Sequence, residues 1–592
     1  MSVYFNGELL AIPGAYSVID ATGMSVKVSD TAYKVIAFVG ESGGGEPGAL
    51  QLLSDPVTAK KVLKSGDLLD ACNRAWNPVT SSKEGVPIGG ANLIACIRTN
   101  RATKGSMTVK SGTNTQMVIE SKDWNADANN IEIRMTAKSN NAKVFDMIVH
   151  DHVNDVYETH TNIGGLFILK YTGTEAYCEM NIVKTGTGTS DAEMYLQTKV
   201  GDDAESAVED IKIQLRALDK DVLKSMQVLI STLRAYENYE VITIDGYNMS
   251  TKCGSIDPVS GVDIKSGNGT VTAFYADLAT KLTRDSEMIQ VKEYSQDYGL
   301  PAPFDYTYLT GGSDGTTPAS WVGYFDQLSN YNISYIVPLT GDRSIHAELF
   351  AHVKDLSGSK GRERRMIVGG EIGETLADTI NRAKLFCNAR VQVVHGGFYD
   401  YDANNNLTLY APYILAAQHA GRCAHLDDGE SATHDTYAMA SPEYKLGQSD
   451  VKQCLDAGVV CFEFVLRPNT VNGSYVRLVH DLTTDTVNSD NSVYAERATG
   501  ELADSINKEI REKIDRILTG KRSTIYDLTA VKNAVLTILL NRKIKGQIIE
   551  YKGVYVTKTG TVTTVDYSVA PSEPNNFTLI TAHYYSQTIS AE

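Results

Sequence analysis

The sequence predicts an α+β multidomain chain whose α/β core is formed by the N-terminal part and the C-terminal half. Three observations predict it. From residue 318 onward, helical and strand patterns alternate, which is typical of a parallel α/β layer. Residues 103–200 instead show period-two alternation rich in Thr, Ser, Asn and Gly, as in inserted β-rich domains. Short alternating segments lie at both ends, and with 592 residues the chain has room for roughly four domains.

Residues 1–30 are predicted to form an extended N-terminal arm. Two short alternations lie on either side of Pro13-Gly14, and they contain too little apolar surface to build a core of their own. Such a strand has to pair with another element. The apolar residues of this arm are Val3, Phe5, Tyr16 and Val18.

Residues 31–102 are predicted to be the first part of the core. Tyr33 to Val39 is a nearly continuous apolar strand, followed by a long glycine-rich loop. Asp55-Pro56 has the composition of a helix start, and Gly89 to Ile97 is a second buried strand.

Residues 103–308 are predicted to be inserted into this core as two units. The first, 103–200, has the alternation of a small sandwich or barrel. The second, 201–308, is predicted to be an α/β module, with helical spacing from Asp202 to Tyr236 and another helix around Phe274 to Leu282.

Residues 309–490 carry the alternating pattern of the main core. Each strand is short and apolar, and each is separated from the next by a helix-length segment, so right-handed parallel crossovers are expected. The predicted elements are the helices Trp321–Leu328, Ser344–Leu356 and Leu376–Phe386, and the strands Ile333–Pro338, Met366–Gly369 and Val391–His395.

Residues 491–592 are predicted to be a C-terminal domain with a terminal arm. Its expected elements are the helices Tyr494–Leu518 and Leu528–Leu540 and a hairpin of Gln547–Thr557 with Thr561–Val569. Pro571 and Pro574 then separate a last strand from the body. The residues of this second arm are Phe577, Leu579, Thr581, His583 and Tyr585.

Composition excludes several partner classes. The net charge of −17 does not favour binding to a phosphate backbone, so no nucleic acid partner is expected. The longest apolar run, Ala534 to Leu540, is too short to cross a bilayer, and Met1 to Gly14 does not resemble a secretory signal. Assembly in a cytoplasm follows as the expectation. The eight cysteines form no Cys-x-x-Cys pair and are interpreted as reduced core residues.

Val368 to Glu374 is the best argument for an enzyme. This segment follows a strand and opens a helix, as a phosphate-binding loop would. However, Glu371 and Glu374 place negative charge where phosphate would lie, and the Lys-Ser/Thr ending of a P-loop is missing. We therefore expect a tight strand-to-helix turn, no cofactor and no catalytic residue.

Two groups of histidines are candidates for a metal site or a hydrolytic site. His150 and His152 can share one face of a strand, with His160 as a possible third metal ligand, but a surface cluster is the commoner explanation. His419, His425 and His434 lie near Ser431 and two aspartates without a nucleophile elbow, so an ordinary polar loop is expected. No metal site is predicted.

Several segments together resemble the contractile-tail sheath family of phages and related injection machines. The resemblance covers about two thirds of the chain. It rests on Pro13-Gly14-Ala15-Tyr16, Ala37 to Gly48, Leu309 to Gly315, Leu478 to Thr483, Ile517 to Lys521 and the final hairpin.

The resemblance implies a virion protein, not an enzyme. It would form hexameric rings stacked helically around a tail tube, contract during genome ejection and contact tail tube, baseplate and tail terminator proteins. The two arms would exchange between subunits. A charged helix is the candidate for the tube contact, with the residues Lys508, Arg511, Glu512, Lys513 and Asp515, and an ordinary solvated helix face is the alternative.

Other functions remain open at this point. A bacterial contractile injection system or a bacteriocin-like particle would use the same kind of sheath. A nucleotide-binding enzyme is the alternative outside this class, and residues 103–199 could bind host surfaces as an adhesin would.

Overall fold

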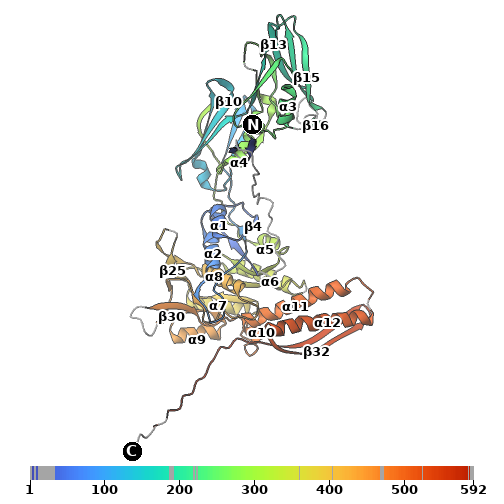
Figure 1. Ribbon diagram of the computed structural model, residues 1–592. Helices are drawn as coiled ribbons and strands as arrows, with labels where there is room; N and C mark the ends of the chain where they lie inside the picture. The colour runs from blue at the N-terminus through green and yellow to red at the C-terminus, as the bar shows by residue number, and fades with distance from the viewer. Residues whose placement is uncertain are drawn as a thin grey trace, which may run out of the picture.

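The computed structural model describes residues 3–5, 8–10, 34–185, 193–217, 220–221, 225–267, 269–358, 360–402, 404–466, 473–522, 524–584 and 586. Residues 34–102 and 309–490 form a body, residues 491–571 form a C-terminal part beside it, and residues 103–308 form a lobe on top of it (Figure 1). The chain after residue 571 leads away from the body. We call these parts the body, the C-terminal part, the lobe and the tail.

A seven-stranded sheet forms the centre of the body. All neighbouring strands pair in parallel except β4, which is antiparallel to β6 at one edge. In spatial order, the strands are β29 (Val459–Val460), β24 (Val391–Val394), β23 (Arg365–Gly369), β22 (Ile333–Pro338), β3 (Val35–Gly40), β6 (Ile94–Arg98) and β4 (Leu50–Leu53). This sheet combines strands from before the lobe with strands from after it.

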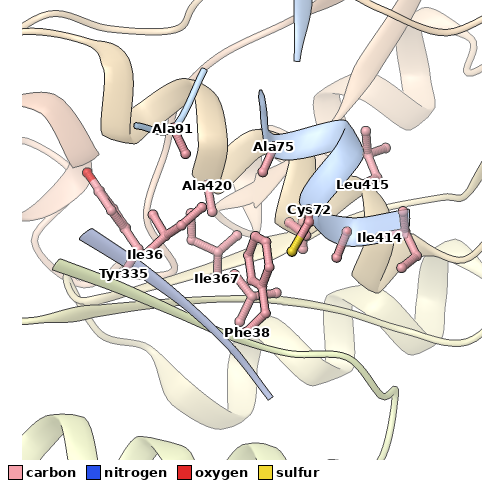
Figure 2. Close-up of a cluster of buried hydrophobic side chains, with 14 of the residues drawn as sticks. Ile36, Phe38, Cys72, Ala75, Ala91, Tyr335, Ile367, Ile414, Leu415 and Ala420 are labelled. Carbon is pink, nitrogen blue, oxygen red and sulfur yellow. The ribbon is translucent and has the colours of Figure 1, made fainter. Parts of the chain in front are cut away.

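The parallel strands of this sheet are buried on both faces, whereas the edge strand β4 is partly exposed. In β3, Ile36 and Phe38 face one apolar cluster, and Val35, Ala37 and Val39 face another. Figure 2 shows Ile36 and Phe38 packed with residues of the first cluster. Burial on both sides explains why the strands are nearly continuous apolar runs.

Helices cover the two faces of the sheet. The first cluster includes residues of α2 (Asp67–Trp76) and α8 (Pro412–His425). The second includes residues of α5 (Val322–Leu328), α6 (Arg343–Ser357), α7 (Leu376–Phe386) and α9 (Gln448–Asp456). Helix α1 (Pro56–Leu63) begins at Asp55, whose carboxylate accepts a hydrogen bond from the Thr58 amide.

Two small antiparallel sheets complete the body. One consists of β30 (Phe462–Leu466), β31 (Ser474–Leu478), β27 (Thr436–Tyr437) and β5 (Val79–Ser81). The other consists of β26 (Leu407–Tyr410), β25 (Phe398–Tyr401) and β28 (Ser441–Pro442).

The lobe contains four antiparallel sheets. They are β11-β10-β9-β21, β17-β12-β19, β16-β15-β14-β13-β18 and β20-β8-β7. The strand bounds are β7 (Ser106–Ser111), β8 (Asn114–Ser121), β9 (Ile131–Lys138), β10 (Asn141–Asp151), β11 (Val156–Ile163), β12 (Gly165–Tyr171), β13 (Tyr177–Thr185), β14 (Glu193–Gly201), β15 (Val208–Ala217), β16 (Lys220–Asp221), β17 (Tyr239–Thr243), β18 (Val259–Asp263), β19 (Gly269–Thr272), β20 (Ile289–Tyr294) and β21 (Phe304–Tyr308). Its helices are α3 (Met226–Leu233) and α4 (Phe274–Asp285).

The lobe differs from the prediction in two respects. Strands on both sides of the predicted division at 200/201 pair with each other, so this position does not separate two units: β14 pairs with β15, and β13 with β18. The helix predicted from Asp202 to Tyr236 is wrong for its first half. Ile211, Ile213 and Leu215 are buried at every second position of β15, which is the period of a strand.

The C-terminal part consists of α10 (Ser492–Ala495), α11 (Arg497–Leu518), α12 (Ile525–Ile544), β32 (Ile548–Thr559) and β33 (Val562–Pro571). Helices α11 and α12 pack together and against the β32–β33 hairpin around one apolar cluster. The strand predicted from Phe577 to Tyr585 is absent over residues 577–584, where the tail has no ladder to join. The predicted α+β multidomain class is confirmed.

Candidate assembly surface

A buried ionic network attaches α11 to the body. The Arg497 guanidinium, which has no solvent exposure, donates from Nε to the Asp481 carboxylate at 2.8 Å and from Nη2 to the Glu430 carbonyl at 2.7 Å. Its Nη1 donates to the Tyr335 hydroxyl of β22 at 3.1 Å and also pairs with Glu501. The start of α11 is therefore joined directly to the central sheet.

Asp481 and His419 extend this network to α8. Burial raises the pKa of Asp481, but the Arg497 guanidinium and His419 hold it well below its usual range. Burial lowers the pKa of His419, but the Cys423 sulfur and the Asp481 carboxylate raise it to about 9. The imidazole Nε2 lies 3.5 Å from the Asp481 carboxylate. His419 is therefore a buried cation that compensates a buried anion.

A second set of ion pairs joins both long helices to the body. Arg542 of α12 pairs at 2.8 Å with Asp428 and with Glu509 of α11. Asp504 of α11 pairs with Arg365 at 2.8 Å and with Arg390 at 2.7 Å. These contacts fix how the C-terminal part projects from the body.

The β32–β33 hairpin has unpaired edges. Each strand pairs only with the other, and neither edge carries a further strand within the described residues. A groove of about 370 Å³ lies between α11 and β33. Its apolar lining includes Leu502 and Ile506 from α11, and Val565 and Val569 from β33. An edge strand beside an apolar groove can accept another strand and bury that strand's side chains.

The tail carries apolar side chains into solvent. Its last described contact with the body is the Asn576 amide donating to Glu496. Beyond it, the exposed fraction is 83% for Phe577, 95% for Leu579 and 96% for Tyr584. Apolar residues this exposed indicate a contact surface.

The structure describes only some of the residues predicted to form the two arms. Thr581 and His583 lie in the tail and are exposed. Val3 and Phe5 lie in β1 (Val3–Phe5), which pairs with β2 (Glu8–Leu10). The remaining arm residues, Tyr16, Val18 and Tyr585, fall outside the described residues.

The five predicted tube-facing residues lie on the second half of α11 in two groups. Lys508 and Arg511 are directed at the body, where they contact Asn332 and Glu363 respectively. Glu512, Lys513 and Asp515 are exposed, and the side chain of Arg511 is itself 43% exposed. Glu512 pairs with Arg516 at 2.8 Å along the same helix.

The segment considered as a phosphate loop is already occupied by internal contacts. The Glu371 carboxylate accepts a hydrogen bond from the Gly341 amide at 2.6 Å, and Glu374 pairs with Arg382 at 2.7 Å. These contacts support the predicted tight turn between β23 and α7.

The polar cluster predicted as a loop is partly helical and more buried than expected. His419 and His425 belong to α8, and His419 has no solvent exposure. Sequence reasoning missed the network around it because its members are far apart in the chain. A signal was present: Gln418, His419 and Arg422 interrupt an otherwise apolar helix.

Seven of the eight cysteines are buried, and Cys387 is partly exposed; all eight are free thiols. Of the other histidines considered, His150 and His152 lie together with Glu132, whereas His160 pairs with Glu158. No helix in the described part of the chain is long and apolar enough to span a membrane.

Sequence comparison finds relatives over nearly the whole length. The chain is 28% identical over 590 residues to a tail sheath protein of Bacillus phage SP01, covering 99% of this chain and 97% of the relative. It is 29% identical over 594 residues to a putative tail sheath protein of Enterococcus phage phiEF24C, covering 99% of both chains. A tail sheath protein of Staphylococcus phage Twort is 23% identical, covering 98% of each chain. No family model matches.

Two solved structures share the fold. A sheath tail protein from Listeria innocua aligns with a TM-score of 0.52 at 13% identity, covering 91% of this chain and 92% of that chain. A sheath tail protein from Desulfitobacterium hafniense aligns with a TM-score of 0.50 at 13% identity, covering 94% of this chain and all of that chain. The resemblance predicted from the sequence is thereby confirmed: the chain is similar to phage tail sheath proteins over nearly its whole length.

Proposed function

We propose that the protein is the structural subunit of a contractile sheath in a phage tail, and that it has no catalytic role. It polymerises as stacked hexameric rings around a tail tube and contracts to drive the tube through the host envelope. Full-length similarity to phage tail sheath proteins supports this assignment. The observation that carries the polymerisation is the coexistence, in one C-terminal part, of an unpaired sheet edge and an unpaired apolar tail.

In this proposal, the tail of one copy adds a strand to β33 of another. The exposed tail residues 577–584 are close in length to β33, which has 10 residues. The tail leads away from α11 and the hairpin of its own chain (Figure 1), which favours donation to a neighbour. Backbone hydrogen bonds would supply affinity, and alternate side chains would enter the groove.

The N-terminal arm, residues 1–30, would make a second link of the same kind. Two links per subunit allow the bodies to rotate while the subunits stay connected. Contraction needs no bound fuel if the extended state is metastable and the contracted state buries more surface. A gain of a few kcal/mol per subunit, about that of one or two buried apolar side chains, adds up over many rings.

Negative-stain electron microscopy of the purified chain at rising concentration tests self-assembly. We expect tubes or stacked rings from the full chain and none from a variant truncated before Asn575. Circular dichroism on the truncated variant checks that the body remains folded. A compact monomer from the full chain, both alone and with its tube protein, would contradict the proposal.

The tube contact is proposed for the exposed face of α11. Because Lys508 and Arg511 are engaged with the body, Lys513 is the sharper position to test. We expect Lys513→Glu to weaken assembly on the tube by less than about 1 kcal/mol per subunit, since exposed ion pairs contribute little singly. Co-sedimentation with tube protein at low and high salt measures this effect. Lys110→Glu, at an exposed position of the lobe, is the matched control, and an equal loss in both variants would refute the assignment.

The lobe is proposed to lie on the outside of the sheath. It is inserted between Ala102 and Leu309, at the end of the body opposite the C-terminal part (Figure 1). This position would leave the strand links and the tube contact free of the lobe.

A further inference from the structure

A polar row crosses all four strands of the β11-β10-β9-β21 sheet. His150 of β10 lies directly opposite Glu132 of β9 and opposite Tyr157 of β11. Glu132 is in turn opposite Tyr308 of β21. His152 follows the end of β10, and its amide donates to the Asn130 carbonyl. Backbone register therefore brings together side chains that are far apart in sequence.

Three of these side chains converge on one point. The Glu132 Oε1 atom lies 3.2 Å from His150 Nδ1 and 2.9 Å from His152 Nε2. One ligand atom from each residue lies within 4.8 Å of the others. The two imidazole rings are 3.9 Å apart, and His150 stacks on Tyr157 at 3.8 Å with an interplanar angle of 7°.

This donor set has the chemistry of a transition-metal site. Zn²⁺ binds imidazole nitrogen and carboxylate oxygen at about 2.0–2.2 Å, which puts tetrahedral ligand atoms about 3.3 Å apart. The distances from Glu132 to the two histidines are close to that spacing. We propose that Glu132, His150 and His152 bind one divalent transition-metal ion of the zinc class on the lobe.

The surroundings support a metal site beyond the three ligands. His150 Nε2, the nitrogen facing away from Glu132, lies 3.3 Å from the Asp155 carboxylate. A carboxylate in this position orients a metal-binding imidazole and raises its basicity. His150 is buried, whereas the side chain of His152 is 41% exposed, which leaves the site accessible to an ion from solvent.

The ion would have a structural role and not a catalytic one. It would tie the turn after β10 to β9, in a lobe whose sheets have no disulfide to hold them. His160, which sequence reasoning offered as a third ligand, is held by Glu158 on β11 and takes no part.

Metal titration of the tag-free, chelator-treated full chain tests the site. We expect isothermal titration with ZnCl₂ to give one strong site per chain, and Co²⁺ to develop the visible absorption bands of a low-coordinate complex. Binding should weaken in acid, because protons compete with the metal ion for the ligand atoms.

Two variants and one control locate the ion. His152→Ala removes an exposed ligand, and Glu132→Gln keeps the shape of the side chain; each should lower the affinity at least tenfold while circular dichroism stays unchanged. His583→Ala removes an exposed histidine of the tail and should leave binding unchanged. Absence of a stoichiometric site in the folded full chain, or unaltered binding in both ligand variants, would overturn the proposal.

Discussion

The lobe and the C-terminal part differ in how much of their apolar surface they leave exposed. The lobe pairs its strands within four sheets and buries two apolar clusters of its own. The C-terminal part ends in a two-stranded hairpin, a groove and a tail. Among the large apolar residues described as exposed in the lobe, the most exposed is Val208 at 66%, whereas Leu579 of the tail reaches 95%.

The difference indicates which part of the molecule is needed for assembly. The lobe buries most of its apolar side chains in two clusters of its own, although each of its open sheets also has edge strands. The hairpin edges and the apolar tail are covered by no described residue of the same chain, so another molecule can cover them. The polymer is therefore expected to depend on the C-terminal part and to tolerate loss of the lobe.

Deleting the lobe in one variant and the tail in another is expected to give the largest difference in polymerisation. Thr103 and Ser313 exchange backbone hydrogen bonds at the base of the lobe. That pairing matches the flanks of a two-residue hairpin, so residues 104–312 can be replaced by Asn-Gly. We expect this shortened chain to fold and polymerise, whereas truncation before Asn575 abolishes polymers.

Electron microscopy of the two variants side by side measures this. Removing the lobe also removes the Trp124 carbonyl that accepts from Arg98, but Arg98 keeps its bonds to Gly45 and Asn100. If the chain without the lobe stays monomeric although folded, the lobe takes part in assembly and the comparison fails.

The attachment of α11 to the body is expected to have the next largest effect. Arg497→Met leaves the buried Asp481 and Glu501 without their guanidinium, which should destabilise the body by about 3–5 kcal/mol. Urea unfolding followed by tryptophan fluorescence, to which the buried Trp321 contributes, measures the loss. Arg516→Met, on the exposed face of the same helix, should change stability by less than about 0.5 kcal/mol. A similar small change for Arg497→Met would show that the network does not hold α11.

The protonation of His419 gives a smaller effect with a defined sign. The folded-state pKa of about 9 lies above the unfolded value of about 6.5. The folded chain therefore binds more protons between these values, so this stabilisation is complete below about pH 6.5 and is lost as the pH rises to about 9. Between pH 6.5 and 9, we expect the free energy of unfolding of the unmodified chain to fall by about 1–3 kcal/mol more than that of a His419→Gln variant. If the free energy of unfolding falls equally with pH in both proteins, His419 is not charged in the folded chain.

Strong periodicity made much of the body predictable from sequence. The strand Ile333–Pro338 and the helix Leu376–Phe386 have the predicted bounds, because each buries a regular set of apolar residues. The prediction of a helix for β15 is wrong because its exposed residues Glu209 and Lys212 have the spacing of one helix face, whereas its buried residues alternate as in a strand.

The candidate sites were less predictable because they depend on register and on partners. Glu132 meets His150 only through the β9–β10 pairing, and Arg497 reaches Tyr335 across 162 residues. The tail is predicted as a strand, but a strand needs a pairing partner, and residues 577–584 have none among the described residues of the chain.

Binding of the isolated tail to a chain without a tail tests the central claim most directly. A labelled peptide of residues 575–592 is titrated with the chain truncated before Asn575, and fluorescence anisotropy reports binding. We predict saturable binding that unlabelled peptide competes away. A Thr578→Pro peptide, which lacks one backbone donor, should bind at least tenfold more weakly than a Thr578→Ala peptide. No binding to the folded chain, or equal binding of both peptides, would contradict strand donation to the β33 edge.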